Sequence, residues 1–256
     1  MFKIATWNVN SLKVRLPHVL EWIESEQPDV LALQETKTTD DNFPLNEIKE
    51  AGYFVSYTGQ KTYNGVATLC RAPLETIATC IPDFEDEQRR VLAINNSGIT
   101  VLNLYVPNGS EVDSDKYRYK LDWFANLHPF ITKLLSNNDR LIILGDFNIA
   151  PEDRDVHDPQ EWQGNVLVSA PERAEFDKLI AQGLVDCFRL FDQEDNCFSW
   201  WDYRAAAFRR NRGLRIDHIL ASKALFESCK KCYIDKNPRK LERPSDHTPV
   251  VAEFEL

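Results

Sequence analysis

Asp146 and Asn148 are short polar side chains that directly follow an apolar run at residues 141–144. The run is typical of a strand buried on both faces, and Gly145 would end it before the two polar residues. In open α/β sheets, ligands bind outside the carboxyl ends of the strands. A carboxylate and an amide at that position could hold a cation or accept a proton. Asp and Asn are also ordinary turn formers, so this stretch alone leaves both interpretations open.

Similar polar residues follow other predicted strands. Asn8 comes after the first apolar run of the chain, where it could also be a turn residue, and Glu35 comes after the second. A glutamate at the end of a buried strand is energetically costly unless it is solvated, paired or bound to a cation. Tyr105 stands just before a Pro-Asn-Gly turn, where it is either a core tyrosine or a phenol directed at the same site.

The last third of the chain repeats the pattern. Asp217 precedes a predicted strand at 218–221, and Asp246 and His247 precede the closing strand at 250–254. A single histidine in a loop is usually structural or solvated, so His247 alone does not indicate a site. Taken together, however, the polar residues at or near predicted strand ends form a set that chance rarely produces: Asn8, Glu35, Tyr105, Asp146, Asn148, Asp217, Asp246 and His247.

The segment 198–217 interleaves aromatic residues with arginines, which is unusual for a water-exposed loop. Aromatic rings can stack on exposed bases or sugars while guanidinium groups hold phosphates. The alternative is an aromatic cluster that only pins a long loop, which Trp201 and Tyr203 could do. The arginines of the segment are Arg204, Arg209, Arg210, Arg212 and Arg215.

The elements that would position these residues are predicted from hydrophobic periodicity. A helix that begins after Ser11, a candidate N-cap, should run until Pro28 stops it. A long amphipathic helix is predicted at 114–136 and a short one at 174–182, whereas residues 151–170 have an irregular pattern. Further strands, arranged in antiparallel meanders, are predicted at 53–57, 65–70, 90–94 and 100–106.

The chain has 256 residues, of which 43% are hydrophobic, and no linker or repeat divides it, so one domain covering 1–256 is expected. The N-terminus does not resemble a signal peptide and no apolar stretch approaches membrane-spanning length, which predicts a cytoplasmic protein without membrane association. Six cysteines are too few for a disulfide framework at this length. Cys229 and Cys232 lack a second ligand pair for zinc, so ordinary thiols are expected.

A net charge of −10 argues at first against a nucleic-acid partner, because phosphate backbones are bound through Lys and Arg. The distribution weakens this argument, since five arginines fall within 204–215 and acidic residues can lie on amphipathic helices or beside a metal. Three basic residues near the start of the long helix, Lys116, Arg118 and Lys120, are expected to form a solvated face rather than a phosphate clamp. Global charge therefore does not decide the partner.

Seven motifs combine these residues with their neighbours: 6–11 (TWNVNS), 33–37 (LQETK), 63–67 (YNGVA), 105–108 (YVPN), 145–150 (GDFNIA), 213–217 (GLRID) and 245–249 (SDHTP). In this order they resemble the exonuclease III family of apurinic/apyrimidinic endonucleases, within the endonuclease/exonuclease/phosphatase superfamily. The resemblance spans residues 1–256. The Asn, Glu, Asp-x-Asn and Ser-Asp-His elements mark the superfamily, while the segment 198–217 looks specifically like exonuclease III.

The resemblance implies a four-layered α/β sandwich, with two packed mixed β-sheets flanked by helices and an active site at one edge. It implies Mg²⁺ as the cofactor, with Mn²⁺ as a substitute, because hard cations prefer oxygen ligands. The metal ligands would be Glu35, Asn8 and Asp246, with Asp146 and Asn148 as further ligands if a second metal binds.

The same resemblance implies roles in phosphodiester hydrolysis. Asp146, oriented by Asn148, would take the proton from the attacking water. His247, held by Asp217 and charged, would face a phosphoryl oxygen. Tyr105 would donate a hydrogen bond to the phosphate or assist the leaving group.

The implied substrate is double-stranded DNA with abasic sites or 3′ ends, cleaved by a monomer. Incision would fall 5′ to the abasic site, and blocked or ordinary 3′-terminal nucleotides would be removed. Trp200, Leu214 and Ile216 would wall a pocket for the extruded deoxyribose, and Asn108 would contact the phosphate. The duplex would be held by Arg209, Arg210 and Arg212.

Two other functions remain open at the level of sequence. The same metal site could hydrolyse a lipid, an inositol phosphate or RNA, although the loop rich in arginine and tryptophan argues against this. The protein could also be a DNA-binding module without catalysis. A DNA-binding module without catalysis would lack a metal ligand or a catalytic base, and none of the eight polar residues at the predicted strand ends is missing.

Overall fold

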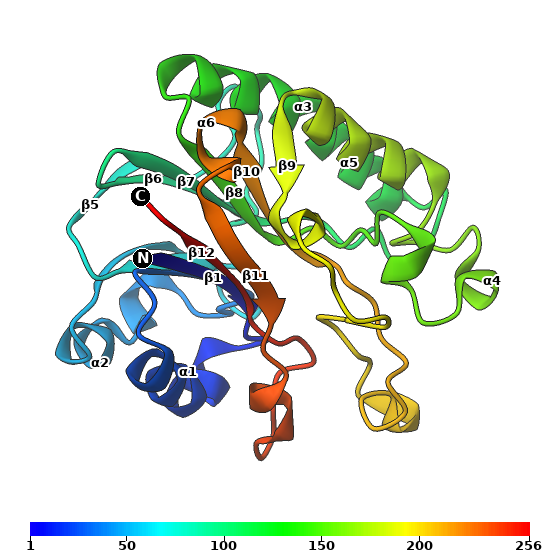
Figure 1. Cartoon of the computed structure of the whole chain (residues 1–256), viewed down its shortest axis with the longest axis horizontal. Coiled ribbons are helices and arrows are strands. Elements are labelled where there is room, and N and C mark those ends of the chain that lie inside the picture. Colours follow the sequence, from blue (N-terminus) through cyan, green and yellow to red (C-terminus); the bar gives the residue numbers. More distant parts are fainter.

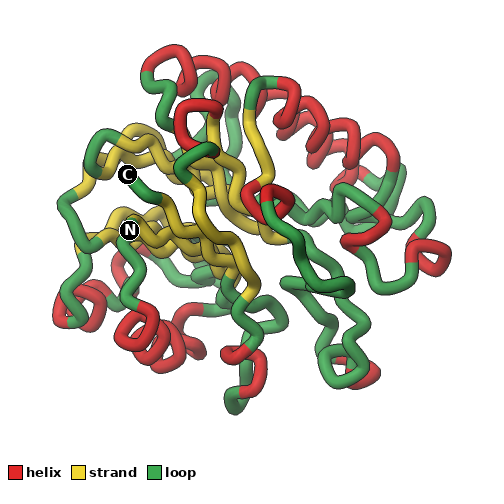
Figure 2. Tube along the Cα trace, viewed as in Figure 1, coloured by secondary structure: helices red, strands yellow, loops and turns green.

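Two six-stranded β-sheets pack face to face in the computed structural model, which describes residues 1–256, and helices cover the outer face of each sheet (Figure 1). Figure 2 shows the same order of layers: helix, strand, strand, helix. Each sheet contains one parallel pair, β1 with β2 and β7 with β8, and its other neighbours are antiparallel. The predicted four-layered sandwich of mixed sheets is therefore confirmed.

The first sheet has the strand order β11-β12-β1-β2-β4-β3. Its closing strand β12 lies antiparallel to the first strand β1, with Phe2 opposite Phe254, so the first and last strands of the chain lie side by side (Figure 1). The strands are β1 (Phe2–Asn8), β2 (Val30–Gln34), β3 (Phe54–Thr58), β4 (Val66–Cys70), β11 (Cys229–Ile234) and β12 (Val250–Phe254).

The second sheet has the strand order β5-β6-β7-β8-β10-β9. Its strands β5, β6 and β7 form an antiparallel meander, as the alternation of their residues predicts. The strands are β5 (Leu74–Ala78), β6 (Val91–Asn96), β7 (Ile99–Tyr105), β8 (Leu141–Asp146), β9 (Leu184–Asp186) and β10 (Asp217–Ser222).

The outer layers consist of helices α1 and α2 over the first sheet and α3 and α5 over the second. Two shorter helices, α4 and α6, lie in connections (Figure 1). The helices are α1 (Leu12–Glu26), α2 (Leu45–Glu50), α3 (Asp115–Asn137), α4 (Pro159–Trp162), α5 (Ala170–Ala181) and α6 (Lys223–Phe226). None of these helices is both long and apolar enough to cross a membrane.

Strand β8 is buried on both faces, as its apolar run predicts. Ile142 and Leu144 point into the core between the sheets, while Leu141 and Ile143 pack under α3. Each of these fully buried side chains contributes about 1.5–3 kcal/mol by its removal from water. The central strand therefore holds Asp146 at a rigid position at its carboxyl end.

Three strands are absent from the sequence-based prediction. β5 and β11 lie at sheet edges, where exposed side chains and β-bulges break the alternation of buried and exposed residues. β9 is only three residues long. Cys229 and Cys232, both on β11, point into the core between the sheets rather than toward a metal-binding loop.

One predicted helix start and one predicted helix cap differ from the structure. α5 begins at Ala170, four residues earlier than expected, because Ser169 and Glu172 form a capping box there. Ser11 does occupy the N-cap position of α1, but its side chain makes no capping hydrogen bond. Its backbone N–H instead donates to the carbonyl of Glu35 over 2.8 Å. Ser11 thus fastens the start of α1 to the end of β2.

Candidate active site

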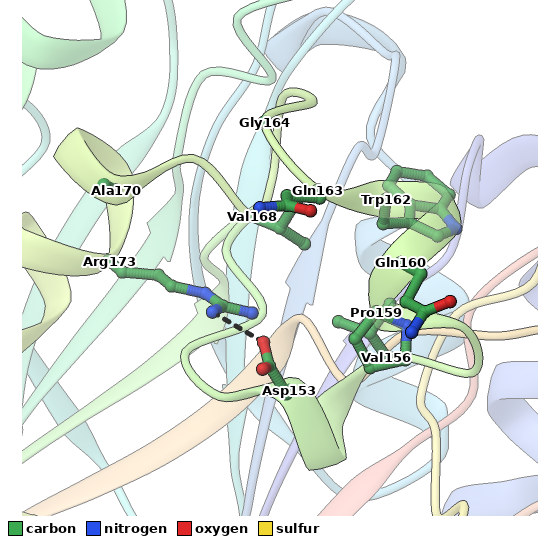
Figure 3. Close-up of a pocket in the computed structure, with 10 residues that line it drawn as sticks. All are labelled: Asp153, Val156, Pro159, Gln160, Trp162, Gln163, Gly164, Val168, Ala170 and Arg173. Atoms are coloured by element: carbon green, nitrogen blue, oxygen red, sulfur yellow. Dashed lines mark hydrogen bonds and ion pairs between the residues drawn. The ribbon is translucent and has the colours of Figure 1, made fainter.

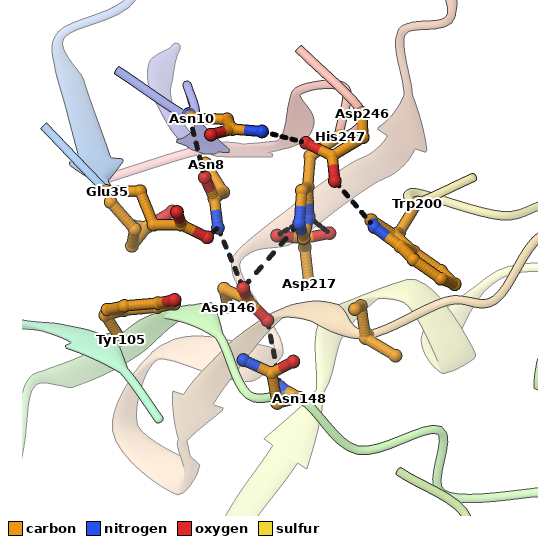
Figure 4. Close-up of polar contacts among 12 residues, drawn as sticks. Asn8, Asn10, Glu35, Tyr105, Asp146, Asn148, Trp200, Asp217, Asp246 and His247 are labelled. Atoms are coloured by element: carbon orange, nitrogen blue, oxygen red, sulfur yellow. Dashed lines mark hydrogen bonds and ion pairs between the residues drawn. The ribbon is translucent and has the colours of Figure 1, made fainter. Parts of the chain in front are cut away.

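The strand directions bring the polar strand ends to one edge of the sandwich. Because β1 and β2 are parallel, Asn8 and Glu35 leave the first sheet side by side. Because β7 and β8 are parallel and in register, Tyr105 lies opposite Asp146 in the second sheet. These four residues come from both sheets, so they face one another where the sheets meet (Figure 4).

The antiparallel strands contribute their amino ends to the same edge. Asp217 begins β10 and pairs with Asp146 across the sheet. His247 precedes β12 and is joined by a β-bridge to Trp200. Ser245 holds this loop in place, since its hydroxyl donates to the carbonyl of Asn8 over 2.7 Å and accepts the N–H of His247 over 3.2 Å.

The backbone at this edge adopts φ angles that residues with a side chain rarely have. Gly145 has a φ of 147°, and a Cβ atom there would lie 1.9 Å from the carbonyl oxygen of Leu104. Glu35 and Asn148 have φ angles of 51° and 49°, in the left-handed region. Such conformations cost about 1–3 kcal/mol each for residues other than glycine and tend to occur at functional sites.

Asn8 joins the two sheets through its side chain. Its amide nitrogen donates to Glu35 Oε1 and to Asp146 Oδ2, each over 2.9 Å (Figure 4). Its amide oxygen accepts the backbone N–H of Asn10 over 3.0 Å. The second oxygen of Glu35 lies 2.7 Å from Lys37 Nζ. Asn8 therefore sets the separation between the two carboxylates.

His247 lies between two carboxylates. Its Nδ1 is 2.9 Å from Asp217 Oδ2, and its Nε2 is 3.7 Å from Asp146 Oδ2. Burial favours the neutral ring, but the carboxylates of Asp217 and Asp146 outweigh it and raise the pKa of His247 to about 10. The ring is therefore an imidazolium at neutral pH and presents a cationic N–H toward Asp146 and the site.

Asp146 is almost fully buried, with 1% of its surface exposed. Burial raises the pKa of this carboxyl to about 7, against the lowering effect of the His247 charge and the Asn8 hydrogen bond. Its other oxygen, Oδ1, accepts the N–H of Asn148 over 2.9 Å. A carboxyl group with a pKa near neutrality is suited to accept a proton and release it again.

A possible metal site exists among these groups. One ligand atom each from Glu35, Asp146 and His247 lies within 4.8 Å of the others, and because His247 is an imidazolium, the two carboxylates are the candidate ligands. Three carboxylates, including Asp217, meet only two cationic side chains, His247 and Lys37, so the charge of the cluster favours a further cation. Carboxylate oxygens from two strands are also the ligands that Mg²⁺ prefers. The residues present therefore fit a hard divalent ion.

Asp246 lies beside this cluster, and both of its oxygens have other partners. Oδ1 accepts from Asn10 Nδ2 over 2.9 Å, and Oδ2 accepts from Trp200 Nε1 over 3.0 Å (Figure 4). Burial alone would raise the pKa of this carboxyl, but the His247 charge and these two hydrogen bonds lower it below its usual range. Asp246 is therefore a carboxylate at neutral pH.

Tyr105 is held at the opposite side of the site by Arg90. The guanidinium carbon of Arg90 lies 4.5 Å from the centre of the Tyr105 ring, and its Nη1 donates to the Tyr105 carbonyl over 3.2 Å. Burial and the negative charge of Glu35 raise the pKa of Tyr105 well above its ordinary value of 10.0. The phenol therefore keeps its proton and can donate a hydrogen bond.

Asn108 and Asn148 form a pair of amides next to Asp146. Asn108 Nδ2 donates to Asn148 Oδ1 over 3.0 Å, and Asn148 Nδ2 donates to the carbonyl of Val106 over 2.9 Å. The backbone of this pair is fixed by Lys120, whose Nζ donates to the carbonyls of Asn108 and Asn148 over 3.2 and 2.7 Å.

The expectation that Lys120 lies on a solvated face is wrong. Its side chain is fully buried and pairs with Glu172 of α5 at 2.5 Å, whereas Lys116 and Arg118 are exposed as expected. The partner of Lys120 stands 52 residues away, on another helix. A buried charge is stable only when such a partner and hydrogen bonds are present.

The three residues expected to wall a sugar pocket do lie together. Leu214 and Ile216 are buried in a small cluster against which the half-buried Trp200 packs. Val156 and Val168 belong to the same cluster and also line a cavity of about 520 Å³ beside α4 (Figure 3). The apolar cluster therefore separates the site from this cavity only by the thickness of its own side chains.

The arginines of the segment 198–217 differ in their surroundings. Arg209 and Arg210 are exposed, as a contact with DNA would require. Arg212 forms an ion pair with Glu161. Arg215 is buried and pairs with Asp155 and Asp186 at 2.6 and 2.8 Å, so it belongs to the interior.

Four further residues at the site were not among those predicted from the sequence. Asn10 and Lys37 each lie two residues beyond a predicted ligand, inside motifs that the resemblance already used. Lys37 Nζ contacts Asn10 Oδ1 over 2.5 Å. Ser199 accepts the backbone N–H of Asp217 over 3.1 Å, and Ser245 supports Asn8. Ser245 lies inside the motif 245–249, whereas no local pattern marks Ser199, whose partner Asp217 is 18 residues away.

Comparison with known proteins agrees with this geometry. An exodeoxyribonuclease III from Haemophilus influenzae is 39% identical, covering 98% of this chain and 99% of its own length. The structure of 3′ phosphatase NExo from Neisseria bound to product DNA hairpin matches with a TM-score of 0.96 and 44% identity over 100% of both chains. An AP endonuclease from Archaeoglobus fulgidus matches with a TM-score of 0.95 and 37% identity, also over 100% of both chains.

The model of the endonuclease/exonuclease/phosphatase family matches residues 5–247, a range that includes all eight polar strand-end residues. Both the family and the fold that the sequence motifs suggest are thereby confirmed. The chain belongs to the endonuclease/exonuclease/phosphatase family, in its exodeoxyribonuclease III branch of hydrolytic nucleases.

Proposed function

We propose that this chain is a Mg²⁺-dependent DNA repair nuclease that cuts the phosphodiester 5′ to abasic sites and trims 3′ ends of double-stranded DNA. The observation that supports this most is the group of Glu35, Asp146 and His247, whose ligand atoms lie within 4.8 Å of one another. The relatives named above are an exodeoxyribonuclease, a 3′ phosphatase and an AP endonuclease. One active site should therefore act on both 3′ ends and abasic sites of DNA.

A single bond unites these activities. Incision 5′ to an abasic site, release of a 3′ phosphate and removal of a 3′-terminal nucleotide all break the bond between phosphorus and a 3′ oxygen. In each case water attacks phosphorus and the 3′ oxygen leaves as a hydroxyl. The reactions differ only in what is attached to phosphorus on its other side. One set of catalytic groups is therefore sufficient, and the surrounding loops select the substrate.

The metal would be held by Glu35, with Asp146 as a further ligand only if a second metal binds, and Asn8 keeps these two carboxylates at a fixed separation. When bound, Mg²⁺ supplies Lewis acidity toward the phosphoryl oxygens. Asn8 and Asp246 were also expected as ligands from the sequence. In the structure the amide nitrogen of Asn8 faces the carboxylates, and the oxygens of Asp246 face other donors.

The side chains supply the remaining chemistry. Asp146 accepts the proton of the attacking water, since burial raises the pKa of this carboxyl to about 7. The imidazolium of His247 donates a hydrogen bond to a phosphoryl oxygen, where negative charge grows as the water oxygen bonds to phosphorus. Tyr105 donates its phenolic hydrogen to the phosphate or to the leaving 3′ oxygen, because its pKa is well above neutrality.

Substrate recognition would use the neighbouring surfaces. Asn108 contacts the phosphate, and Arg209 and Arg210 hold the backbone of the duplex. Trp200, with the buried Leu214 and Ile216 behind it, offers an apolar wall without partners for a base edge, which suits a sugar that carries no base. The chain would act as a cytoplasmic monomer, with residues 1–256 as one catalytic domain.

A panel of substrates tests the proposal. Labelled duplexes carrying an abasic analogue, a 3′ phosphate or an ordinary recessed 3′ end would be compared with an inositol phosphate, a sphingolipid and a polyadenylate RNA, each with Mg²⁺ and with chelator. The proposal predicts that kcat/KM for at least one of the DNA substrates exceeds the values for the inositol phosphate, the sphingolipid and the RNA. Preferential hydrolysis of a lipid, inositol phosphate or RNA would overturn it.

A further inference from the structure

The carboxylate of Asp246 connects the loop that carries His247 to the apolar wall. Its Oδ2 accepts the indole N–H of Trp200 over 3.0 Å, and its Oδ1 accepts from Asn10 over 2.9 Å (Figure 4). Asn10 follows β1, whereas Trp200 belongs to the loop rich in arginine and tryptophan. Asp246 thus fixes the edge of the indole ring relative to the catalytic strands.

The other contacts of the Trp200 ring are apolar or aromatic. The backbone of Trp200 is held firmly, since its N–H donates to the Leu214 carbonyl and its carbonyl accepts the N–H of Leu214, each over 3.0 Å. The ring itself meets Trp162 edge-on at a centroid distance of 6.5 Å and tilts against His247 at the same distance. Trp200 also packs against the apolar cluster that contains Leu214 and Ile216, and the indole N–H to Asp246 is the one hydrogen bond of the ring.

We propose that Asp246 is a positioning residue that fixes Trp200 as a wall of the sugar pocket, rather than a ligand of the catalytic metal. The inference rests on the proposed DNA substrate for its effect on activity. It deepens that proposal because it links substrate selection to the loop that also carries His247. A hydrogen bond with a charged acceptor contributes about 1.5–3 kcal/mol, which is sufficient to select one orientation of the ring.

The positions of the other carboxylates support this assignment. Glu35 and Asp146 place carboxylate oxygens within 4.8 Å of each other and of a nitrogen of the charged His247 ring, and Asp246 is not part of this group. Both oxygens of Asp246 already accept hydrogen bonds from side chains of different segments. These two bonds leave lone pairs free on both oxygens, but they hold the carboxylate toward Asn10 and Trp200.

The first test observes the hydrogen bond without any DNA. Nuclear magnetic resonance of the ¹⁵N-labelled protein resolves the indole N–H signals, and the Trp200→Phe variant identifies the signal of Trp200 by its disappearance. In Asp246→Ala this signal should move upfield, and its proton should exchange with solvent about tenfold faster. An unchanged signal with unchanged exchange would overturn the proposal, whatever the protein does to DNA.

The second test separates positioning from metal binding. Mg²⁺ binding would be measured by calorimetry for Asp246→Ala, Trp200→Phe and, as the control for a lost metal ligand, Glu35→Gln. The proposal predicts that Mg²⁺ affinity falls about tenfold or more in Glu35→Gln only. If Asp246→Ala loses as much affinity as Glu35→Gln while Trp200→Phe does not, Asp246 is a metal ligand and the proposal is wrong.

The third test uses a double-mutant cycle on cleavage of an abasic duplex. Asp246→Ala and Trp200→Phe should each raise KM about tenfold, and the double variant should be no worse than either single one, because both remove the same bond. Additive effects would contradict the coupling. If the wild type does not cleave the duplex at all, the proposed substrate fails, while the resonance and calorimetry results still decide the role of Asp246.

Discussion

His247 Nδ1 lies 2.9 Å from Oδ2 of Asp217, a residue that is itself fully buried and begins β10. The same strand pairing sets Asp217 opposite Asp146, which lies 3.7 Å from the other nitrogen of the ring. The imidazolium is thus held between two strands of one sheet. Its charge and its direction both depend on Asp217.

The first prediction concerns this pair. Asp217→Asn removes the charge that favours the imidazolium, so the single-turnover rate on an abasic duplex should fall about 10²-fold or more, and His247→Ala should lower it by a similar or larger factor. The double variant should be no slower than the worse single variant, because both changes remove one charged unit.

A histidine and carboxylate pair away from the site provides the control. His128 and Glu175 lie 2.8 Å apart, on α3 and α5. Glu175→Gln should leave the cleavage rate unchanged. Equal losses in Glu175→Gln and Asp217→Asn would mean that the effect comes from general damage to the fold.

A second prediction concerns the buried cation beneath the two asparagines. Lys120→Met leaves Glu172 as an unpaired buried charge, so the free energy of unfolding should drop by about 3–5 kcal/mol in urea titrations. Lys178→Met is the matched control, because Lys178 pairs with Glu175 at 2.7 Å while 60% of its side chain is exposed. That change should cost less than about 1 kcal/mol. Similar values for both variants would show that burial of the Lys120 pair is unimportant.

A third prediction concerns stability in acid. Nδ1 of His218 accepts from Arg215 over 3.0 Å, and Nε2 donates to the carbonyl of Ile149 over 2.9 Å, which requires the neutral ring. Burial and the charge of Arg215 lower the pKa of His218 from 6.5 to about 4. The unfolded chain therefore binds the proton first. The stabilisation is complete above pH 6.5 and is lost as the pH falls toward 4, by about 3 kcal/mol.

Urea unfolding between pH 6.5 and 4 measures this loss. The His218→Gln variant should be less stable above pH 6.5, but its stability should decline less steeply with acid, since glutamine does not titrate. Parallel pH profiles for the two proteins would show that His218 titrates alike in the folded and unfolded states.

A fourth prediction concerns the exposed arginines. Arg209→Ala and Arg210→Ala should each weaken binding of duplex DNA in the presence of chelator, and each should reduce the slope of log affinity against log salt by about one. Arg154→Ala is the control, because Arg154 is also exposed, at 61% of its side chain, but pairs with Glu152 beside α4. An unchanged slope in both Arg209→Ala and Arg210→Ala would remove the segment 198–217 from the DNA interface.

The strands that carry the site could be predicted from the sequence because they are central. β2 and β8 are buried on both faces, so their apolar runs are uninterrupted and end sharply before Glu35 and Asp146. Lys3 and Thr6 interrupt β1, but its buried residues also lead directly to Asn8. The edge strand β11 could not be predicted in the same way. Its two lysines at 230 and 231 face outward and a bulge interrupts its register.

Contacts between distant segments could not be predicted from the sequence. Asp246 follows the pattern of a metal ligand, yet its oxygens meet Asn10 and Trp200, which stand 236 and 46 residues away. Lys120 has the spacing of a solvated helix face, and only the position of α5 reveals its partner. Residue type and local spacing predict which groups gather at an edge, but not which atoms face each other.

In the proposed reaction water attacks phosphorus and the 3′ oxygen leaves. The most direct measurement is mass spectrometry of the products after the chain cleaves a duplex with one central abasic site in ¹⁸O-labelled water with Mg²⁺. The expected result is one cut on the 5′ side of the abasic site, with the label in the 5′ phosphate and none in the new 3′ hydroxyl. A cut on the 3′ side without label in the phosphate, or no Mg²⁺-dependent cleavage by the folded protein, would contradict it.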